Sequence, residues 1–139
     1  MDYDSRYVGG ILFFNRRDFF EAHEVWEEVW TESSGPERRF YQGLIQAAVA
    51  LHHFRNGNVR GATKLYRTGR AYMEPLDEVY LGLDKQAFWN GMARCFQELH
   101  ATPEPDRKVW LDEALIPTIT LEPPPESWPD VAALAGEDE

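Results

Sequence analysis

The chain has 139 residues, enough for one domain, and 43 % of them are hydrophobic, which is enough to bury a core. Its formal net charge is −10, so a surface that binds nucleic acid over the whole molecule would repel phosphates before any contact formed. Length and charge therefore argue against a chain that is disordered throughout and against a general nucleic-acid binder.

Cysteine usage and hydropathy indicate the compartment. Cys95 is the single cysteine, so no intramolecular disulfide can form, and no Cys/His spacing typical of zinc sites occurs. The N-terminus lacks the basic and then apolar layout of a signal peptide, and no apolar run approaches the roughly 20 residues that span a bilayer. We therefore expect a cytoplasmic protein with no membrane partner.

Proline usage divides the chain in two. Seven of the nine prolines lie beyond residue 102, whereas residues 1–101 contain only Pro36 and Pro75. Apolar residues upstream recur at helical spacing, with turn residues between the stretches. This pattern predicts an all-α fold, a compact multihelical bundle of helical hairpins over 1–101, with a proline-rich acidic extension over 102–139 packed partly on it. The predicted helices cover 4–14, 18–31, 37–55, 58–80 (with a break allowed at Pro75) and 84–100.

The second predicted helix, 18–31, has one apolar face, formed by Phe19, Ala22, Trp26, Val29 and Trp30. Glu21 and Glu28 lie on the opposite face and should point to water. Between these zones lie His23, Glu24 and Glu27, which we expect to be partly buried. A carboxylate in such a position needs a partner.

The third predicted helix, 37–55, is apolar nearly all round between Arg39 and Arg55, a pattern typical of a central helix. Gln42, Gln46 and His53 share one stripe of it, within about 40° of one another. Because buried amides and imidazoles need hydrogen-bond partners, we predict a partly buried polar cluster between the second and third helices. Its members are His23, Glu24, Glu27, Gln42, Gln46 and His53.

Two interpretations of this cluster stay open. In the first, the two glutamines donate to Glu24 or Glu27, and the network only fixes helix register. In the second, His23, Glu24, Glu27 and His53 line a cleft that binds a divalent metal or performs acid–base chemistry. The order His-Glu-x-x-Glu is not the His-Glu-x-x-His zinc signature, because Glu27 replaces the second histidine, so the metal prediction is weakly supported.

The remaining segments add fewer candidates. Arg60, Lys64 and Arg67 form a basic stripe on the fourth helix that could meet an anionic ligand or pair with the acidic second helix. We interpret Cys95 as a core thiol. Downstream we predict a short helix over 106–114, an extended strap over 115–121 laid across the bundle, and an acidic end from Glu122 that frays into solvent.

An internal repeat and a charge pattern cross these elements. At an offset of 40 residues, helical positions correspond as Ile11/Leu51, Phe14/Phe54, Asp18/Asn58, Ala22/Ala62, Val25/Leu65 and Trp26/Tyr66. This resembles the stacking of tetratricopeptide helical hairpins, and chance similarity of two amphipathic hairpins is the alternative. Residues 18–37 carry seven acids and no base, and residues 38–73 carry seven bases and no acid, which favours antiparallel packing of successive helices.

Three motif blocks then occur in order over about residues 8–72. They are Phe20-Glu21-Ala22-His23-Glu24-x-x-Glu27-x-x-Trp30, Phe40-x-Gln42-Gly43-Leu44-Ile45-Gln46-x-Ala48, and His53-x-x-x-Gly57-Asn58-x-x-Gly61-Ala62. In these blocks the chain resembles the domain of unknown function 309 family of small all-helical proteins. The resemblance implies a compact multihelical bundle whose shared polar positions are the six residues of the predicted cluster. It implies no reaction, cofactor or substrate.

Two functional hypotheses follow. The first is a binding or scaffold module in which an aromatic groove, with Trp89 or Tyr80 as an exposed anchor, engages a protein partner or a second copy of the chain. The second is a metal-dependent or acid–base enzyme, hydrolase-like, centred on His23, Glu24, Glu27 and His53.

Overall fold

The structure is a computed structural model that describes residues 3–103 and 108–130. It confirms the predicted all-α fold, a compact bundle of five helices with little strand. The elements in chain order are α1 (Ser5–Asn15), α2 (Phe19–Glu32), α3 (Gly35–Arg55), α4 (Val59–Met73), β1 (Val79–Tyr80), β2 (Leu83–Asp84), α5 (Lys85–Ala101) and the 3₁₀ turn η1 (Glu113–Leu115).

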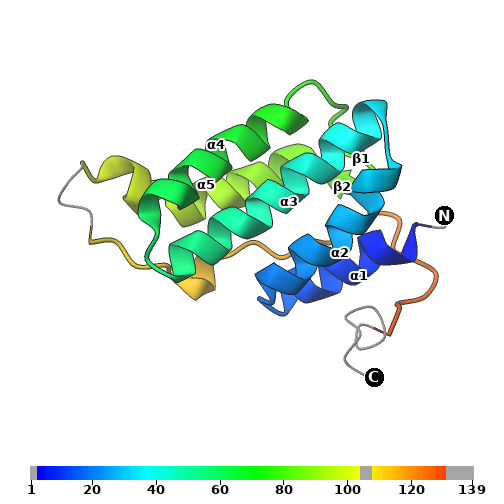
Figure 1. Cartoon of the computed structure of the whole chain (residues 1–139), viewed down its shortest axis with the longest axis horizontal. Helices are drawn as coiled ribbons and strands as arrows, with labels where there is room; N and C mark the ends of the chain where they lie inside the picture. The colour runs from blue at the N-terminus through cyan, green and yellow to red at the C-terminus, as the bar shows by residue number, and fades with distance from the viewer. Residues whose placement is uncertain (1–2, 104–107, 131–139) are drawn as a thin grey trace.

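Helix α3 lies at the centre of the bundle, between α2 on one side and α4 on the other, with α1 beside α2 and α5 beside α4 (Figure 1). Its residues Leu44, Ala47, Ala48 and Leu51 have no exposed surface. This confirms the central position predicted from its nearly uniform apolar surface, because a helix that is packed on several sides needs apolar residues on each of them.

The two hairpins α1–α2 and α3–α4 have the same turn geometry, 40 residues apart. The backbone N–H of Asp18 and that of Asn58 each donate, over 2.8 Å, to the carbonyl five residues earlier. The residues before them, Arg17 and Gly57, both have positive φ, 71° and 81°. The predicted helical-hairpin repeat is therefore present in the backbone as well as in the sequence.

The fourth predicted helix, 58–80, was too long. Helix α4 ends at Met73, and Pro75 follows at a point where a helix would need a backbone N–H donor. The chain then forms the antiparallel pair β1–β2, whose turn residues Leu81 and Gly82 both have positive φ. Two consecutive positive φ values are typical of the tight turns that join hairpin strands.

The predicted helix over 106–114 was also wrong where it can be compared. Residues 104–107 lie outside the described residues, residues 108–112 are not helical, and only the single turn η1 forms, capped by the Asp112 side chain. Val109 is buried while its neighbour Trp110 is exposed. A helix this short gains too little from its own hydrogen bonds to form without a continuous packed face.

The segment 115–121 runs extended across the bundle and is tied to the first hairpin. Ile116, Ile119 and Leu121 are buried. The Asn15 side chain pairs with both backbone groups of Ile119: its Nδ2 donates to the carbonyl over 3.0 Å, and its Oδ1 accepts from the N–H over 2.8 Å. The Arg17 guanidinium donates to the Ile116 carbonyl over 3.2 Å.

The acidic end does not fray where it begins, contrary to the prediction. The N–H of Glu122 donates to the Gly82 carbonyl over 2.9 Å, and the hydroxyl of Tyr3 donates to the Pro123 carbonyl over 2.6 Å. These bonds hold the start of this segment against the hairpin and the N-terminus. The last predicted frayed residues, 131–139, lie outside the described residues.

The opposite charge blocks do not meet. Among the residues that the structure describes, no ion pair joins an acid of α2 to a base of 38–73; Glu32 pairs instead with Arg6 of α1, over 2.8 Å. Helices α2 and α4 lie on opposite sides of α3 (Figure 1). Exposed ion pairs contribute only about 0–1 kcal/mol each, so apolar burial decides which helices pack together. In the described residues, no helix is long and apolar enough to cross a membrane.

Candidate functional site

The acids of the predicted cluster lie at the surface. The His23 side chain is 20 % exposed, and its Nε2 lies 3.5 Å from Oε1 of Glu27, a carboxylate that is itself exposed. Glu24 is exposed as well. The prediction of partly buried carboxylates was therefore wrong, because α2 packs between α1 and α3 through Phe19, Ala22, Val25, Trp26 and Val29, which leaves positions 24 and 27 on the outer side.

The glutamines of α3 do not reach α2. Gln46 Oε1 accepts a hydrogen bond from the Thr68 hydroxyl of α4, and in the described part of the chain no hydrogen bond joins Gln42 or Gln46 to α2. The cause is the close crossing of α3 and α4, where a Cβ on Gly69 would lie 3.1 Å from the Gly43 carbonyl oxygen. The polar partner of Gln46 therefore lies on α4, whereas the sequence pattern predicted partners on α2.

His53 lies at the turn into α4. Its Nδ1 is 3.3 Å from Nδ2 of Asn58, the residue that caps α4. Burial, and the neighbouring imidazole of His52, lower the pKa of His53. The predicted cluster therefore divides into a His23–Glu27 pair on α2, a Gln46–Thr68 pair between α3 and α4, and a His53–Asn58 pair at the turn, with Gln42 half-buried on α3 and Glu24 in solvent.

A row of rings crosses from α2 to α3, and sequence reasoning missed it. Phe20 is 50 % exposed, yet its ring centroid lies 5.1 Å from that of His23 and 6.0 Å from that of His52. His52 in turn lies 6.1 Å from His53. We call these four residues the ring row. The available signal was the position of Phe20 at the start of one helix and of the two histidines at the end of the next, ends that meet in an antiparallel hairpin.

The predicted exposed anchors are not at the surface. Trp89 is 2 % exposed, and its indole N–H points at Met73 Sδ over 3.1 Å; Tyr80 is half-buried against Phe40. The most exposed tryptophan of the described residues is Trp110, at 77 %, in the C-terminal extension. The amphipathic pattern of α5 could not separate core tryptophans from anchors, because both recur at helical spacing.

The side chains do not assemble a metal centre. Within residues 3–103 and 108–130, no group of three or more His, Cys, Asp or Glu side chains is placed to hold a metal ion. Catalytic metal sites in proteins use about three protein ligands. The divalent-metal prediction for His23, Glu24, Glu27 and His53 therefore gains no geometric support.

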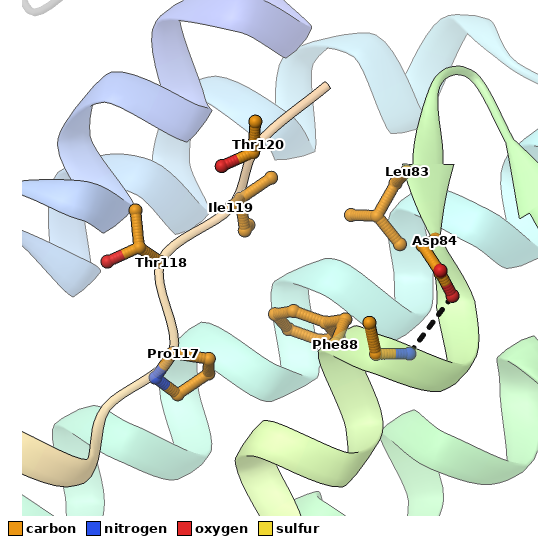
Figure 2. Close-up of a pocket in the computed structure, with 8 residues that line it drawn as sticks. Leu83, Asp84, Phe88, Pro117, Thr118, Ile119 and Thr120 are labelled. Atoms are coloured by element: carbon orange, nitrogen blue, oxygen red, sulfur yellow. Dashed lines mark hydrogen bonds between the residues drawn. The ribbon is translucent and has the colours of Figure 1, made fainter. Parts of the chain in front are cut away.

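Two cavities of the described structure lie away from the predicted site residues. One, of about 300 Å³, opens between the extended segment, β2 and the start of α5 (Figure 2). It is lined by Leu83, Asp84, Ala87, Phe88 and residues 117–120. Asp84 is the one titratable side chain in this lining, and its carboxylate accepts from the Ala87 N–H as the cap of α5, so the cavity holds no acid–base pair.

A second cavity, of about 250 Å³, lies between the end of α4 and the start of α5, over the buried Trp89. Two cations line it, and both are committed to internal acceptors. Lys85 Nζ donates to the Leu76 carbonyl over 2.6 Å, and the Arg70 guanidinium donates to the Tyr66 hydroxyl over 2.8 Å. Each cation therefore already has an acceptor within the chain.

Comparison with known proteins confirms the resemblance predicted from the motifs. The model of the family described as Domain of unknown function (DUF309) matches residues 7–65. The chain is similar to the uncharacterized protein YpuF of Bacillus subtilis (strain 168), with 43 % identity over 65 residues, and to an uncharacterized protein of Aquifex aeolicus (strain VF5), with 35 % identity over 72 residues. These matches cover 45 % and 51 % of this chain, and they span only 37 % and 22 % of the length of the two relatives.

Proposed function

We propose that the domain of unknown function carried by residues 7–65 is a protein-binding module. Its docking surface is the outer side of α2 together with the C-terminal end of α3. The observation that carries this proposal is the ring row, in which a half-exposed Phe20 is held between imidazoles of two different helices.

A fixed aromatic ring at the surface is well suited to anchor a partner. Aromatic anchors dominate the binding energy of many interfaces, because they bury a large area at low cost in conformational entropy. Contacts with His23 and His52 restrict the Phe20 ring before any partner arrives. A single exposed ring is ordinary on a protein surface, and this restraint from two helices is what distinguishes Phe20.

The charge around the ring row selects the partner. Glu24, Glu27 and Glu28 are exposed on α2, and in the described structure none of them pairs with a lysine or arginine. An acidic surface of this kind steers a basic partner and repels an acidic one. We therefore infer a basic amphipathic segment as the ligand, with the apolar part of a side chain, such as the methylene stem of a lysine or arginine, packed on Phe20.

The acid–base alternative has less support, because both ring nitrogens of His23 have neighbours. Its Nδ1 lies 2.8 Å from the Phe20 carbonyl, which can only accept and so fixes a proton on that nitrogen, and Nε2 faces Glu27. The group that Nε2 faces is a single exposed carboxylate, and His23 lines neither of the two cavities described above. We also infer a cytoplasmic location, since the buried thiol of Cys95 is unpaired, as is usual in a reducing compartment.

The test is an NMR titration of the full chain with a synthetic amphipathic helix of leucine and lysine, and with a matched helix of leucine and glutamate. The lysine peptide should shift the amide resonances of 20–27 and 49–54, and the glutamate peptide should not. Phe20→Ser should weaken binding by about tenfold or more. The matched control Val79→Ser removes another exposed apolar side chain, on β1, and should leave the affinity unchanged. Equal affinity for both peptides, or no effect of Phe20→Ser, would refute the proposal.

A further inference from the structure

One face of the bundle carries two edges of opposite charge. Helices α2, α3 and α4 lie side by side with α3 in the middle (Figure 1). The α2 edge exposes Glu24 and Glu27, and the α4 edge exposes Lys64 and Arg67. In the described residues, neither Lys64 nor Arg67 forms an ion pair, so the basic edge, like the acidic one, is not neutralised by lysines, arginines or acids of its own chain.

The middle of this face is uncharged. Residues 40–54 of α3 contain no Asp, Glu, Lys or Arg. Four of their half-buried members, Gln42, Gln46, Val49 and His53, follow one another at intervals of four, three and four positions, which places them on one stripe between the two edges. The face is therefore acidic along α2, uncharged along α3 and basic along α4.

The repeat gives the two edges the same register. Glu24 and Lys64 each follow the first residue of their helix by five positions, and Glu27 and Arg67 follow it by eight. Both helices also start at the same end of α3, because Phe20 contacts His52 and Asn58 contacts His53. Acid and base positions therefore correspond along the direction of α3.

Such a face is complementary to itself. A two-fold axis that lies in the interface and runs along α3 places the α2 edge of one copy over the α4 edge of the other. The contact between an acidic edge and a basic edge therefore occurs twice in the dimer. The same axis places each α3 residue opposite its own copy, which like charges would forbid and which the uncharged stripe allows.

We propose that a second copy of this chain docks on the α2–α3–α4 face with two-fold symmetry. The inference rests on the proposed protein-binding function and names its basic ligand as α4 of the second copy. The acidic edge then meets a helix that carries no acid, since residues 38–73 contain none.

The experiment measures the mass of the full chain by sedimentation velocity, for the wild type and for two charge-reversed variants. Glu24→Lys with Glu27→Lys makes both edges basic, and Lys64→Glu with Arg67→Glu makes both edges acidic. Each variant alone should dissociate at least about tenfold more readily than the wild type. An equimolar mixture should restore the dimer, because each acidic edge then faces a basic edge in both contacts. Circular dichroism checks that the exposed substitutions leave the helices intact.

A matched control distinguishes an effect of charge on this face from an effect of the net charge of the chain. Asp77→Lys with Glu98→Lys makes the same change in charge at exposed positions outside the face, and it should dimerise like the wild type. A mixture that stays monomeric, or a wild-type mass that grows beyond the dimer, would overturn the two-fold arrangement. A monomeric wild type that still binds the leucine–lysine peptide would overturn the second copy as partner and would still support the docking surface. A chain that neither dimerises nor binds this peptide would refute both the dimer and the protein-binding function.

Discussion

One side chain of α1, Asn15, pairs with both backbone groups of Ile119 in the extended segment 115–121, and this gives a quantitative prediction. Asn15→Leu removes both hydrogen bonds to Ile119, a residue that is 5 % exposed, and leaves its N–H and carbonyl without partners. Each buried unsatisfied group costs roughly 1–3 kcal/mol, so the loss of partners for two groups should weaken docking of the segment by about 2–6 kcal/mol. Burial of Ile116, Ile119 and Leu121 contributes more than this, at about 1.5–3 kcal/mol for each side chain.

The segment should therefore stay docked in Asn15→Leu but open more often. Because about 1.4 kcal/mol changes an equilibrium tenfold, amide hydrogen exchange of residues 116–121 should speed up by about 30-fold or more. Asn90→Leu, at an exposed position of α5, is the matched control and should leave this exchange unchanged. Unaltered exchange at 116–121 in Asn15→Leu would show that the Asn15 bonds do not hold the segment.

Three further predictions test the core and the charges. Gly10→Ala should lower the free energy of unfolding by roughly 2–4 kcal/mol and the melting temperature by about 5–15 °C, because the new Cβ would lie 2.0 Å from Nε1 of the buried Trp26; an unchanged melting temperature would contradict this packing. Hydrogen bonds from Arg6 hold the pKa of Glu32 below its ordinary value, so the stabilisation they give is present above the unfolded carboxyl pKa of about 4 and is lost as the pH falls further. The urea midpoints of the wild type and of Arg6→Met should therefore differ at neutral pH and converge in acid. A difference that stays constant with pH would refute this linkage. Burial raises the pKa of Cys95 to about 12, so a thiol reagent at about pH 8 should modify it only after unfolding, and rapid reaction of the native chain would contradict its burial.

The helices and their order could be predicted because periodicity and turn residues both mark them. Periodicity does not mark the end of α4, since apolar residues continue at helical spacing through Met73, Leu76 and Tyr80, and only Pro75 indicated a break there. What ends the helix is local: Pro75 cannot donate a backbone hydrogen bond, and Gly82 adopts a positive φ that a hairpin turn requires.

The polar cluster shows a different limit of sequence reasoning. Helical spacing correctly puts Gln42 and Gln46 on one stripe, but a stripe does not say which neighbouring helix it faces. The small Gly43 and Gly69 bring α4 so close to α3 that the Thr68 hydroxyl bonds to Gln46. The position of Phe20 at a helix start could indicate its nearness to His52, but the contact between the two rings across two helices appears only in the structure.

The 40-residue repeat preserves the core and inverts the charge of the outer side. Trp26 and Tyr66 are both buried, whereas Glu24 corresponds to Lys64. Exposed charges of this kind add little to folding stability, so the fold itself has no need to segregate them on α2 and α4. Since salt screens exposed charges beyond about 8 Å at physiological ionic strength, the two edges, with α3 between them, have their main effect on a partner in contact. We therefore expect this segregation to act on association, and in the proposed dimer added salt should dissociate the two copies while it leaves the melting of the monomer nearly unchanged.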